Sequence, residues 1–373
     1  MEAQGVETMN TTFEVGLTRD FLTTDGQLVY KDIGLGVLAT AGGVRYRFLD
    51  RHEPTMTPEL LADLDAVISL TPNYTTASFE GLHRLTAIVR FGVGYDMVDV
   101  AACTQANVLL CITAGAVNHS VAEATITWML ALSHRVFEKD RLVRQGHWSE
   151  RAHYMGGELR GRTVGVVGLG GIGGRLIELL RGFGMNRPLA FDPYVKPGLA
   201  RELGVELVPL ETLMRQSDFI SVNCPLTAQT RNLIGREQLA LMKPTAFLIN
   251  TARGGIVDEQ ALVEVLRNRQ IAGAATDVYA AEPAGREHPF AGLDNIILAP
   301  HCIAWTDELF AEIGAMAGRS VLELAAGRVP SAGVVNPEVL QRPGFRAKVQ
   351  RYASLGAPTN KSSVHSPKVA AGD

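Results

Sequence analysis

Short apolar runs that alternate with longer amphipathic stretches are the feature that most restricts the fold of this chain. The first series of runs covers residues 14–17, 46–49, 66–70, 87–91 and 108–111, and the second covers residues 162–167, 188–191, 219–222, 246–250, 273–277 and 296–298. This alternation is typical of parallel βαβ units. Two such series predict two α/β domains, each with a Rossmann-like or flavodoxin-like parallel sheet, and a cleft between the domains.

Helical patterns fall between the predicted strands. One covers residues 96–105, and a long apolar helix is predicted over residues 120–136, with Asn118 or Ser120 available as its N-cap. From Asn336 onward no strand pattern is visible, and the last residues are rich in Ser, Pro, Ala and Lys. We therefore expect residues 341–373 to form a flexible tail.

Composition excludes several classes of protein. The 373 residues suffice for two domains, and 46% hydrophobic and 20% charged residues are typical of a globular chain rather than a disordered one. A net charge of −4 gives no sign of nucleic-acid or membrane partners. There is no apolar segment of secretory or membrane-spanning type. The cysteines lack metal-ligand spacing, so we expect reduced thiols, no metal and a cytoplasmic protein; they are Cys103, Cys111, Cys224 and Cys302.

A glycine fingerprint lies between a predicted buried strand, residues 162–167, and a predicted helix, residues 172–180. Gly168 permits a tight turn, Gly170 lets a pyrophosphate approach the backbone, and Gly173 permits close packing of the helix on the strand. The next strand ends at Asp192, 19 residues after Gly173. A carboxylate there accepts hydrogen bonds from ribose hydroxyls and repels a 2′-phosphate. The pattern predicts that the cofactor is NAD rather than NADP.

Three side chains downstream of the fingerprint provide the groups needed to oxidise an α-hydroxy acid. Arg253 follows a predicted strand, and its guanidinium suits a carboxylate and the adjacent carbonyl oxygen. His301 follows the last predicted strand and titrates in the range required of an acid/base. Glu282 precedes it, and a carboxylate paired with an imidazole fixes its tautomer and stabilises its protonated form. This ordered set predicts a hydride-transfer enzyme.

From about residue 15 to residue 340 the chain resembles the D-isomer-specific 2-hydroxyacid dehydrogenase family. The matching segments are residues 90–96, 120–123, 158–161, 168–173, 224–227 and 250–255, together with the run Asp277, Glu282 and His301. The resemblance implies a substrate-binding domain formed by residues 1–115 and 304–340, around an inserted NAD-binding domain formed by residues 116–303. It also implies a homodimer with a contact at the helix of residues 120–136 and its neighbours.

The resemblance further implies roles for individual residues. His301 would be the acid/base, Glu282 its partner, and Arg253 the group that binds and orients the substrate. Val93 and Gly94 would hold the substrate carboxylate with their backbone. The remaining positions would contact the cofactor: Gly168, Gly170, Gly171, Ile172, Gly173, Asp192, Cys224 and Pro225 on the adenosine and pyrophosphate side, and Thr251, Ala252 and Asp277 on the nicotinamide side.

Two departures from the family pattern bear on the substrate. Phosphoglycerate-type members carry an Arg after the third strand, whereas this chain has Ser69, Leu70 and Thr71. An unphosphorylated substrate of the hydroxypyruvate or glyoxylate type is therefore favoured over phosphoglycerate. Trp305 stands four residues after His301, where it either lines the pocket or packs in the core. Alternative readings are an unusual hydride donor such as phosphite, and a non-catalytic NAD-sensing binding module.

Overall fold

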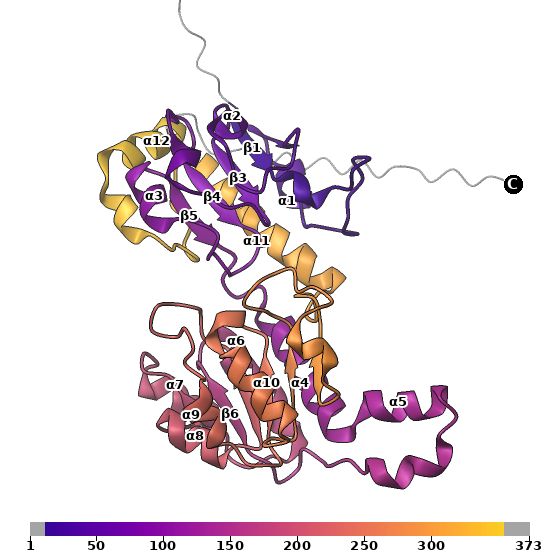
Figure 1. The fold of residues 1–373 in the computed structure, drawn as a ribbon. Coiled ribbons are helices and arrows are strands. Elements are labelled where there is room, and N and C mark those ends of the chain that lie inside the picture. The colour runs from indigo at the N-terminus through magenta and orange to yellow at the C-terminus, as the bar shows by residue number, and fades with distance from the viewer. Residues whose placement is uncertain (1–11, 354–373) are drawn as a thin grey trace, which may run out of the picture. The chain divides into compact units, whose positions relative to one another are not determined.

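A computed structural model describes residues 12–353 of the chain. These residues divide into two compact units (Figure 1). Unit 1 contains the described residues up to Ala116 and those from Asp307 onward, and unit 2 contains Val117–Thr306. Each unit is built on its own parallel sheet, as the two series of apolar runs predict.

The sheet of unit 1 has the strand order β2-β1-β3-β4-β5, and all its pairs are parallel. Its strands are β1 (Phe13–Leu17), β2 (Val44–Phe48), β3 (Ala66–Ser69), β4 (Ala87–Arg90) and β5 (Leu109–Ile112). Val15, Val67 and Ile88 are completely buried. Helices cover both faces of such a sheet, which explains why its inner strands are continuous apolar runs rather than alternating ones.

Helices from both ends of the chain complete unit 1. They are α1 (Gly36–Ala39), α2 (Pro58–Leu61), α3 (Val100–Gln105), α11 (Asp307–Ala325) and α12 (Pro343–Ala353), with the 3₁₀ turns η1 (Arg19–Phe21), η2 (Thr76–Phe79) and η7 (Pro337–Gln341). Helix α3 is shorter than predicted, because Asp99 caps it by accepting a hydrogen bond from the Ala102 N–H.

Helix α12 differs from the flexible tail predicted from residue 341. The helix buries Phe345, Val349 and Tyr352 against the rest of unit 1. The spacing of these three residues places them on one helical face, but the many polar residues between them obscured the pattern. The rest of the predicted tail, residues 354–373, lies outside the described residues.

The sheet of unit 2 has the order β12-β11-β10-β9-β6-β7-β8. Its strands are β6 (Val164–Val167), β7 (Leu189–Phe191), β8 (Glu206–Leu207), β9 (Phe219–Val222), β10 (Phe247–Asn250), β11 (Gly273–Thr276) and β12 (Ile296–Leu298). The chain leaves β6 toward β7 on one side and later returns to β9 on the other. In sheets of this kind, ligands bind at the carboxyl ends of the two strands that flank this switch point. The two-residue strand β8 was not predicted, because two exposed residues give no apolar run.

Unit 2 contains α4 (Asn118–His134), α5 (Val136–Arg144), α6 (Gly171–Leu180), α7 (Pro197–Leu203), α8 (Leu210–Gln216), α9 (Arg236–Ala240) and α10 (Glu259–Arg267). It also has the 3₁₀ turns η3 (Trp148–Tyr154), η4 (Arg181–Phe183), η5 (Gly254–Ile256) and η6 (Pro289–Gly292). The predicted capping of α4 is wrong: its N-cap is Val117, which has no side-chain cap, and Asn118 is already helical. The Asn118 amide instead packs against Gly171.

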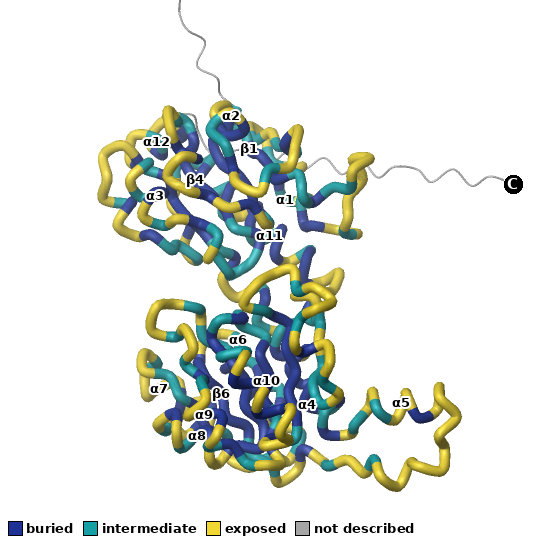
Figure 2. The backbone as a smooth tube through the Cα atoms, viewed as in Figure 1, coloured by how far each residue is buried: buried dark blue, intermediate teal, exposed yellow. Residues whose placement is uncertain are grey.

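Residues 136–155, hereafter the arm, project from the body of unit 2 (Figure 1). Helix α4 itself is buried on one face of the sheet, whereas most of the arm is exposed (Figure 2). Within residues 12–353, no helix combines the length and the apolar character required to cross a lipid bilayer.

Candidate active site

The glycine fingerprint joins β6 to α6. Gly168 has a φ of +97°, and a Cβ atom there would lie 2.7 Å from the backbone nitrogen of Cys224, which follows β9. A Cβ on Gly173 would lie 2.4 Å from the Gly168 carbonyl oxygen. Gly170 is the N-cap of α6 and has open space around it. The loop therefore presents the start of α6, where free N–H groups and the helix dipole favour an anion such as a pyrophosphate.

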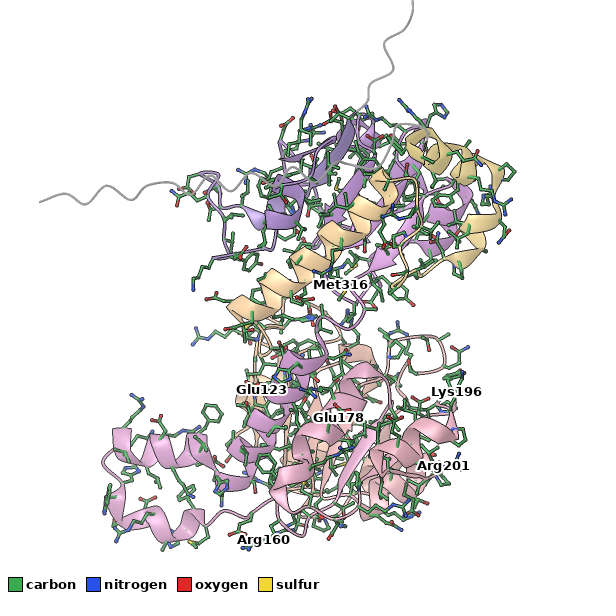
Figure 3. All side chains as sticks on the ribbon, turned by 180° about the vertical axis from the view of Figure 1, so that it is seen from behind. Glu123, Arg160, Glu178, Lys196, Arg201 and Met316 are labelled. Carbon is green, nitrogen blue, oxygen red and sulfur yellow. The ribbon has the colours of Figure 1, made fainter. Side chains whose placement is uncertain are left out.

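Asp192 is held at the end of β7 by three backbone N–H groups. Its Oδ2 accepts a hydrogen bond from Leu169 of the glycine loop at 2.8 Å. Its Oδ1 accepts hydrogen bonds from Tyr194 at 2.8 Å and Val195 at 3.0 Å. The carboxylate is thus fixed beside the loop. Lys196 and Arg201, the basic side chains that follow in sequence, lie exposed at the surface around α7 (Figure 3).

Two orphaned oxygens support a polar ligand at the carboxyl ends of the central strands. Among the described side chains, Asn223 Oδ1 and Thr251 Oγ1 are buried without a hydrogen-bond partner. Asn223 follows β9 and Thr251 follows β10, which are neighbours in the sheet. Buried polar atoms normally have a partner, so these positions fit a cofactor that crosses the strand ends. Thr251 is one of the predicted nicotinamide contacts; nothing in the sequence pointed to Asn223.

The turn that carries Arg253 is fixed by Asn250, the last residue of β10. The Asn250 side chain donates to the Arg253 carbonyl oxygen at 2.9 Å and accepts from the Ala252 N–H at 3.0 Å. Asn250 is only 4% exposed. Arg253 Nη1 donates to the Ala252 carbonyl oxygen at 2.7 Å. Sequence reasoning gave Asn250 no role of its own, because a strand-ending Asn is common.

His301 and Glu282 form a direct pair. The Nδ1 atom of His301 lies 2.7 Å from Glu282 Oε2, and Glu282 Oε1 accepts a hydrogen bond from the Tyr279 N–H at 3.0 Å. Burial by itself would raise the pKa of the Glu282 carboxyl. The hydrogen bonds from His301 and Tyr279, with the positive charges of His301 and Arg253, outweigh burial and hold this pKa below its ordinary value. Glu282 is therefore ionised at neutral pH.

The backbone of His301 is held in a left-handed conformation, with a φ of +55°. Its N–H donates to the Asp277 carbonyl oxygen at 2.8 Å. The Asp277 carboxylate accepts hydrogen bonds from Cys302 at 2.8 Å and Ile303 at 3.2 Å. Burial raises the pKa of Asp277, and these N–H groups and His301 counteract it in part. Such backbone strain persists where surrounding contacts fix it, often at functional sites. Asp277 thus sets the turn that presents His301.

Three adjacent strands therefore supply the predicted catalytic set at one edge of the sheet. Arg253 follows β10, Glu282 lies in the loop after β11, and His301 follows β12. A Cβ on Gly254 would lie 2.0 Å from the Tyr279 carbonyl carbon, so the loops after β10 and β11 are in backbone contact.

The remaining predicted site residues are divided between unit 2 and unit 1. Gly171 and Ile172 are in the first turn of α6. Cys224 and Pro225 follow β9, and burial raises the pKa of the Cys224 thiol to about 11, so this thiol is protonated at neutral pH. Val93 and Gly94 belong to unit 1, in the loop after β4.

The end of β3 in unit 1 carries a carboxylate. The Thr71 N–H donates to Asp20 Oδ2 at 2.8 Å, and the Thr71 hydroxyl bonds the same oxygen. Arg90 Nη1 donates to the Ser69 carbonyl oxygen at 3.2 Å, so this end of β3 has both a carboxylate and a guanidinium beside it. In unit 2, Trp305 is 50% exposed, so it is not a core residue of that unit. No group of His, Cys, Asp and Glu side chains in residues 12–353 is arranged to bind a metal ion.

Comparisons with known proteins identify the family of this chain. The family model described as "D-isomer specific 2-hydroxyacid dehydrogenase, NAD binding domain" matches residues 126–302. A glyoxylate reductase of Korarchaeum cryptofilum is 38% identical over 294 residues, which cover 77% of this chain and 88% of the relative. A D-3-phosphoglycerate dehydrogenase of Methanocaldococcus jannaschii is 37% identical over 76% of this chain and 54% of the relative.

Among solved structures, a protein of Thermus thermophilus superposes with a TM-score of 0.74 and 29% identity, over 87% of this chain and all of that protein. The sequence similarity extends over most of the chain and includes both units. This chain belongs to the D-isomer specific 2-hydroxyacid dehydrogenase family.

Proposed function

We propose that this protein is an NAD-dependent oxidoreductase that interconverts a small, unphosphorylated 2-oxo acid and its D-2-hydroxy acid, of the glyoxylate or hydroxypyruvate type. The observation that carries the proposal is the 2.7 Å pair between His301 Nδ1 and Glu282 Oε2, in the loops beside Arg253. Bound NADH supplies the hydride that reduces the substrate carbonyl carbon.

The residues divide the rest of the chemistry among themselves. Because Nδ1 of His301 is engaged with Glu282, Nε2 is the atom that delivers a proton to the developing alkoxide oxygen and takes it back in oxidation. Glu282 stabilises the protonated imidazole. Arg253 binds the substrate carboxylate and polarises the carbonyl oxygen, and the Val93 and Gly94 backbone assists with the carboxylate.

The cofactor contacts complete the proposal. The start of α6, from Gly170 to Gly173, binds the pyrophosphate, and Asp192 accepts hydrogen bonds from the adenosine ribose. Cys224 and Pro225 line that side. Thr251, Ala252 and Asp277 hold the nicotinamide end. The orphaned Thr251 Oγ1 supports this placement because a ligand would supply its missing partner.

The proposed lack of a substrate phosphate rests on Asp20 and Thr71. Thr71 supplies no cation for a phosphate and is bonded to the Asp20 carboxylate, which suits a substrate with a neutral hydroxymethyl or hydrogen substituent. Glyoxylate and hydroxypyruvate bear such substituents, and the glyoxylate reductases among the relatives support the same class.

The test is the initial rate of NADH oxidation with glyoxylate, hydroxypyruvate, pyruvate, 2-oxoglutarate and 3-phosphohydroxypyruvate. We expect the highest kcat/KM with glyoxylate or hydroxypyruvate and a much lower value with the phosphorylated acid. A preference for 3-phosphohydroxypyruvate would indicate a phosphoglycerate dehydrogenase. Tight NADH binding without turnover of any of the five acids would indicate a binding module or an unusual hydride donor.

We also propose a homodimer formed through the arm. Its exposed apolar side chains are Val136, Phe137, Val143, Trp148 and Met155. A groove of about 920 Å³ separates the arm from the amino-terminal edge of the unit 2 sheet. Several exposed apolar side chains on one projecting segment favour association. Light scattering of the purified protein should give twice the chain mass, and a V143E/W148E variant should give a monomer. A monomeric wild type would contradict the proposal.

We propose that the protein is cytoplasmic. Its four cysteines are free thiols, which suits a reducing compartment. Fractionation of cells that express the full chain should recover it with the cytosolic markers; recovery with periplasmic or secreted protein would contradict this.

A further inference from the structure

We propose that Glu259, held by His288, is a positioning residue of the catalytic site that fixes the loop carrying Glu282, so that Glu282 stays paired with His301. This inference rests on the proposed acid/base role of His301. The contacts of Glu259 and His288 on which it depends all lie within unit 2.

Glu259 is the first residue of α10, and its two carboxylate oxygens have different partners. Oε1 accepts a hydrogen bond from the Ala280 N–H at 2.6 Å, and Oε2 lies 3.4 Å from His288 Nε2. The Glu259 side chain is only 20% exposed and that of His288 only 15%. A largely buried carboxylate that accepts a hydrogen bond from a backbone N–H constrains a loop more strongly than an exposed ion pair does.

The contacts of His288 fix its tautomer. Its Nδ1 accepts a hydrogen bond from the Phe290 N–H at 3.3 Å, so Nδ1 is unprotonated. The proton is therefore on Nε2, which faces Glu259 Oε2 as a donor. The His288 ring also meets the Tyr279 ring edge to face, with centroids 5.2 Å apart. His288 thus contacts both Glu259 and the loop that Glu259 holds.

The loop from Tyr279 to Glu282 carries this constraint to the reacting groups. The Tyr279 N–H donates to Glu282 Oε1 at 3.0 Å, next to the Ala280 N–H that Glu259 binds. The Tyr279 hydroxyl donates to the Ala299 carbonyl oxygen at 2.9 Å, two residues before His301. Two contacts therefore fix the loop that ends in Glu282: Ala280 is bonded to Glu259 of α10, and Tyr279 is bonded to the segment just before His301.

The same loop is packed against the Arg253 turn. Gly254 lies so close to Tyr279 and Ala280 that a Cβ atom would be 2.4 Å from the Ala280 nitrogen. Release of Ala280 would let this backbone contact loosen as well. The ionisable groups that act on the His301 and Glu282 pair are Asp277, Arg253 and Tyr279. Glu259 reaches the pair through the backbone, by its hydrogen bond from the Ala280 N–H.

Two conservative variants separate the contacts. Glu259→Gln keeps an oxygen for the Ala280 N–H but turns an NH₂ toward the Nε2–H of His288. His288→Asn keeps an oxygen acceptor for the Phe290 N–H but is too short to reach Glu259. Glu259→Ala removes both contacts of Glu259. Glu264→Ala is the matched control, because Glu264 is an exposed acid on the same helix, paired with Arg236.

The experiment measures NADH-dependent reduction of the best 2-oxo acid across pH, with NADH affinity and thermal unfolding of each variant. For Glu259→Ala we expect kcat/KM to fall by about tenfold, with NADH affinity within about twofold of wild type. Its alkaline limb should move to lower pH, because a loosened Glu282 stabilises the protonated His301 less. Glu259→Gln and His288→Asn should each lose about threefold, and Glu264→Ala should match wild type.

The outcomes separate this inference from the function on which it rests. An active wild type with unchanged pH profiles in all three variants would overturn the positioning role. Loss of thermal stability without a change in the profile would do the same, since it would reveal a purely structural role. If Glu259→Ala does not fold, the two conservative variants decide. A wild type that turns over none of the acids contradicts the proposed function instead.

Discussion

His301 Nδ1 lies 2.7 Å from Glu282 Oε2, and the opposite oxygen of that carboxylate accepts the Tyr279 N–H. The imidazole is thereby oriented by a carboxylate that is itself oriented by the backbone. Its other nitrogen, Nε2, remains available for proton transfer. The two residues therefore have different roles, proton transfer for His301 and orientation of the imidazole for Glu282, and separate substitutions can test them.

Replacement of His301 by Ala should lower kcat for reduction by roughly 10²–10⁴, because a positioned general acid contributes that much to proton transfer. NADH affinity should stay within about threefold, because the glycine loop and Asp192 lie on other strands of the sheet. Steady-state kinetics and a fluorescence titration with NADH measure the two effects. A kcat close to that of wild type would refute the acid/base role.

Replacement of Glu282 by Gln should shift the pH dependence of both directions. The pKa of Glu282 lies below its ordinary value, so its stabilising charge is present throughout the neutral range and is lost only in acid. Without that charge the protonated imidazole is less stable. Reduction should therefore fail at lower pH than in wild type, and oxidation should begin at lower pH. Profiles of kcat/KM in both directions provide the measurement; limbs that move in opposite directions would contradict the pairing.

Arg253→Lys separates charge from geometry in the substrate site. A lysine keeps the positive charge but cannot form two parallel hydrogen bonds to a carboxylate. We expect KM to rise and kcat to fall together, with a combined loss in kcat/KM of about 10²-fold. Arg253→Ala should lose more. Kinetics with glyoxylate or hydroxypyruvate test this, and an effect confined to NADH affinity would place Arg253 in the cofactor site instead.

Much of this fold was predictable because the central strands of both sheets are buried on both faces. Strand β9 (Phe219–Val222) and strand β12 (Ile296–Leu298) have the predicted bounds, and the other strands that the apolar runs indicated differ by one or two residues at their ends. Burial makes such strands continuously apolar, which is a strong signal. Helix α12 was missed because polar and charged residues separate its three buried apolar residues in the sequence.

Sequence predicts the candidate site only where a single residue type at a strand end indicates its own role. Arg253, Glu282 and His301 stand at strand ends in an order that the family pattern makes specific. The residues that hold them give no such signal. Asn250 bonds the Arg253 carbonyl oxygen and the Ala252 N–H within its own turn, and Glu259 accepts a hydrogen bond from the Ala280 N–H of a distant loop. A hydrogen bond from Ala280 to Glu259 spans 21 residues, and only the folded chain brings the two together.

Asp192→Ala should weaken the preference for NAD. The carboxylate is fixed beside the glycine loop by the N–H groups of Leu169, Tyr194 and Val195, so it is placed to meet a ribose rather than left mobile. Its removal also removes the charge that repels a 2′-phosphate. The ratio of kcat/KM with NADH to that with NADPH should fall by about tenfold or more. An unchanged ratio would show that discrimination lies elsewhere.

Tyr352→Phe tests whether α12 is an integral part of unit 1. The Tyr352 hydroxyl donates to Asp65 Oδ1, and Arg84 donates to both oxygens of the same completely buried carboxylate. Loss of a hydrogen bond to a buried charge should lower the free energy of unfolding by about 1–3 kcal/mol. Gln350→Ala, an exposed change on the same helix, is the control and should have little effect. Urea unfolding at neutral pH measures both. Equal stability of Tyr352→Phe and wild type would mean that Arg84 and the Glu14 N–H satisfy Asp65 without Tyr352, and that this contact of α12 contributes little to the stability of unit 1.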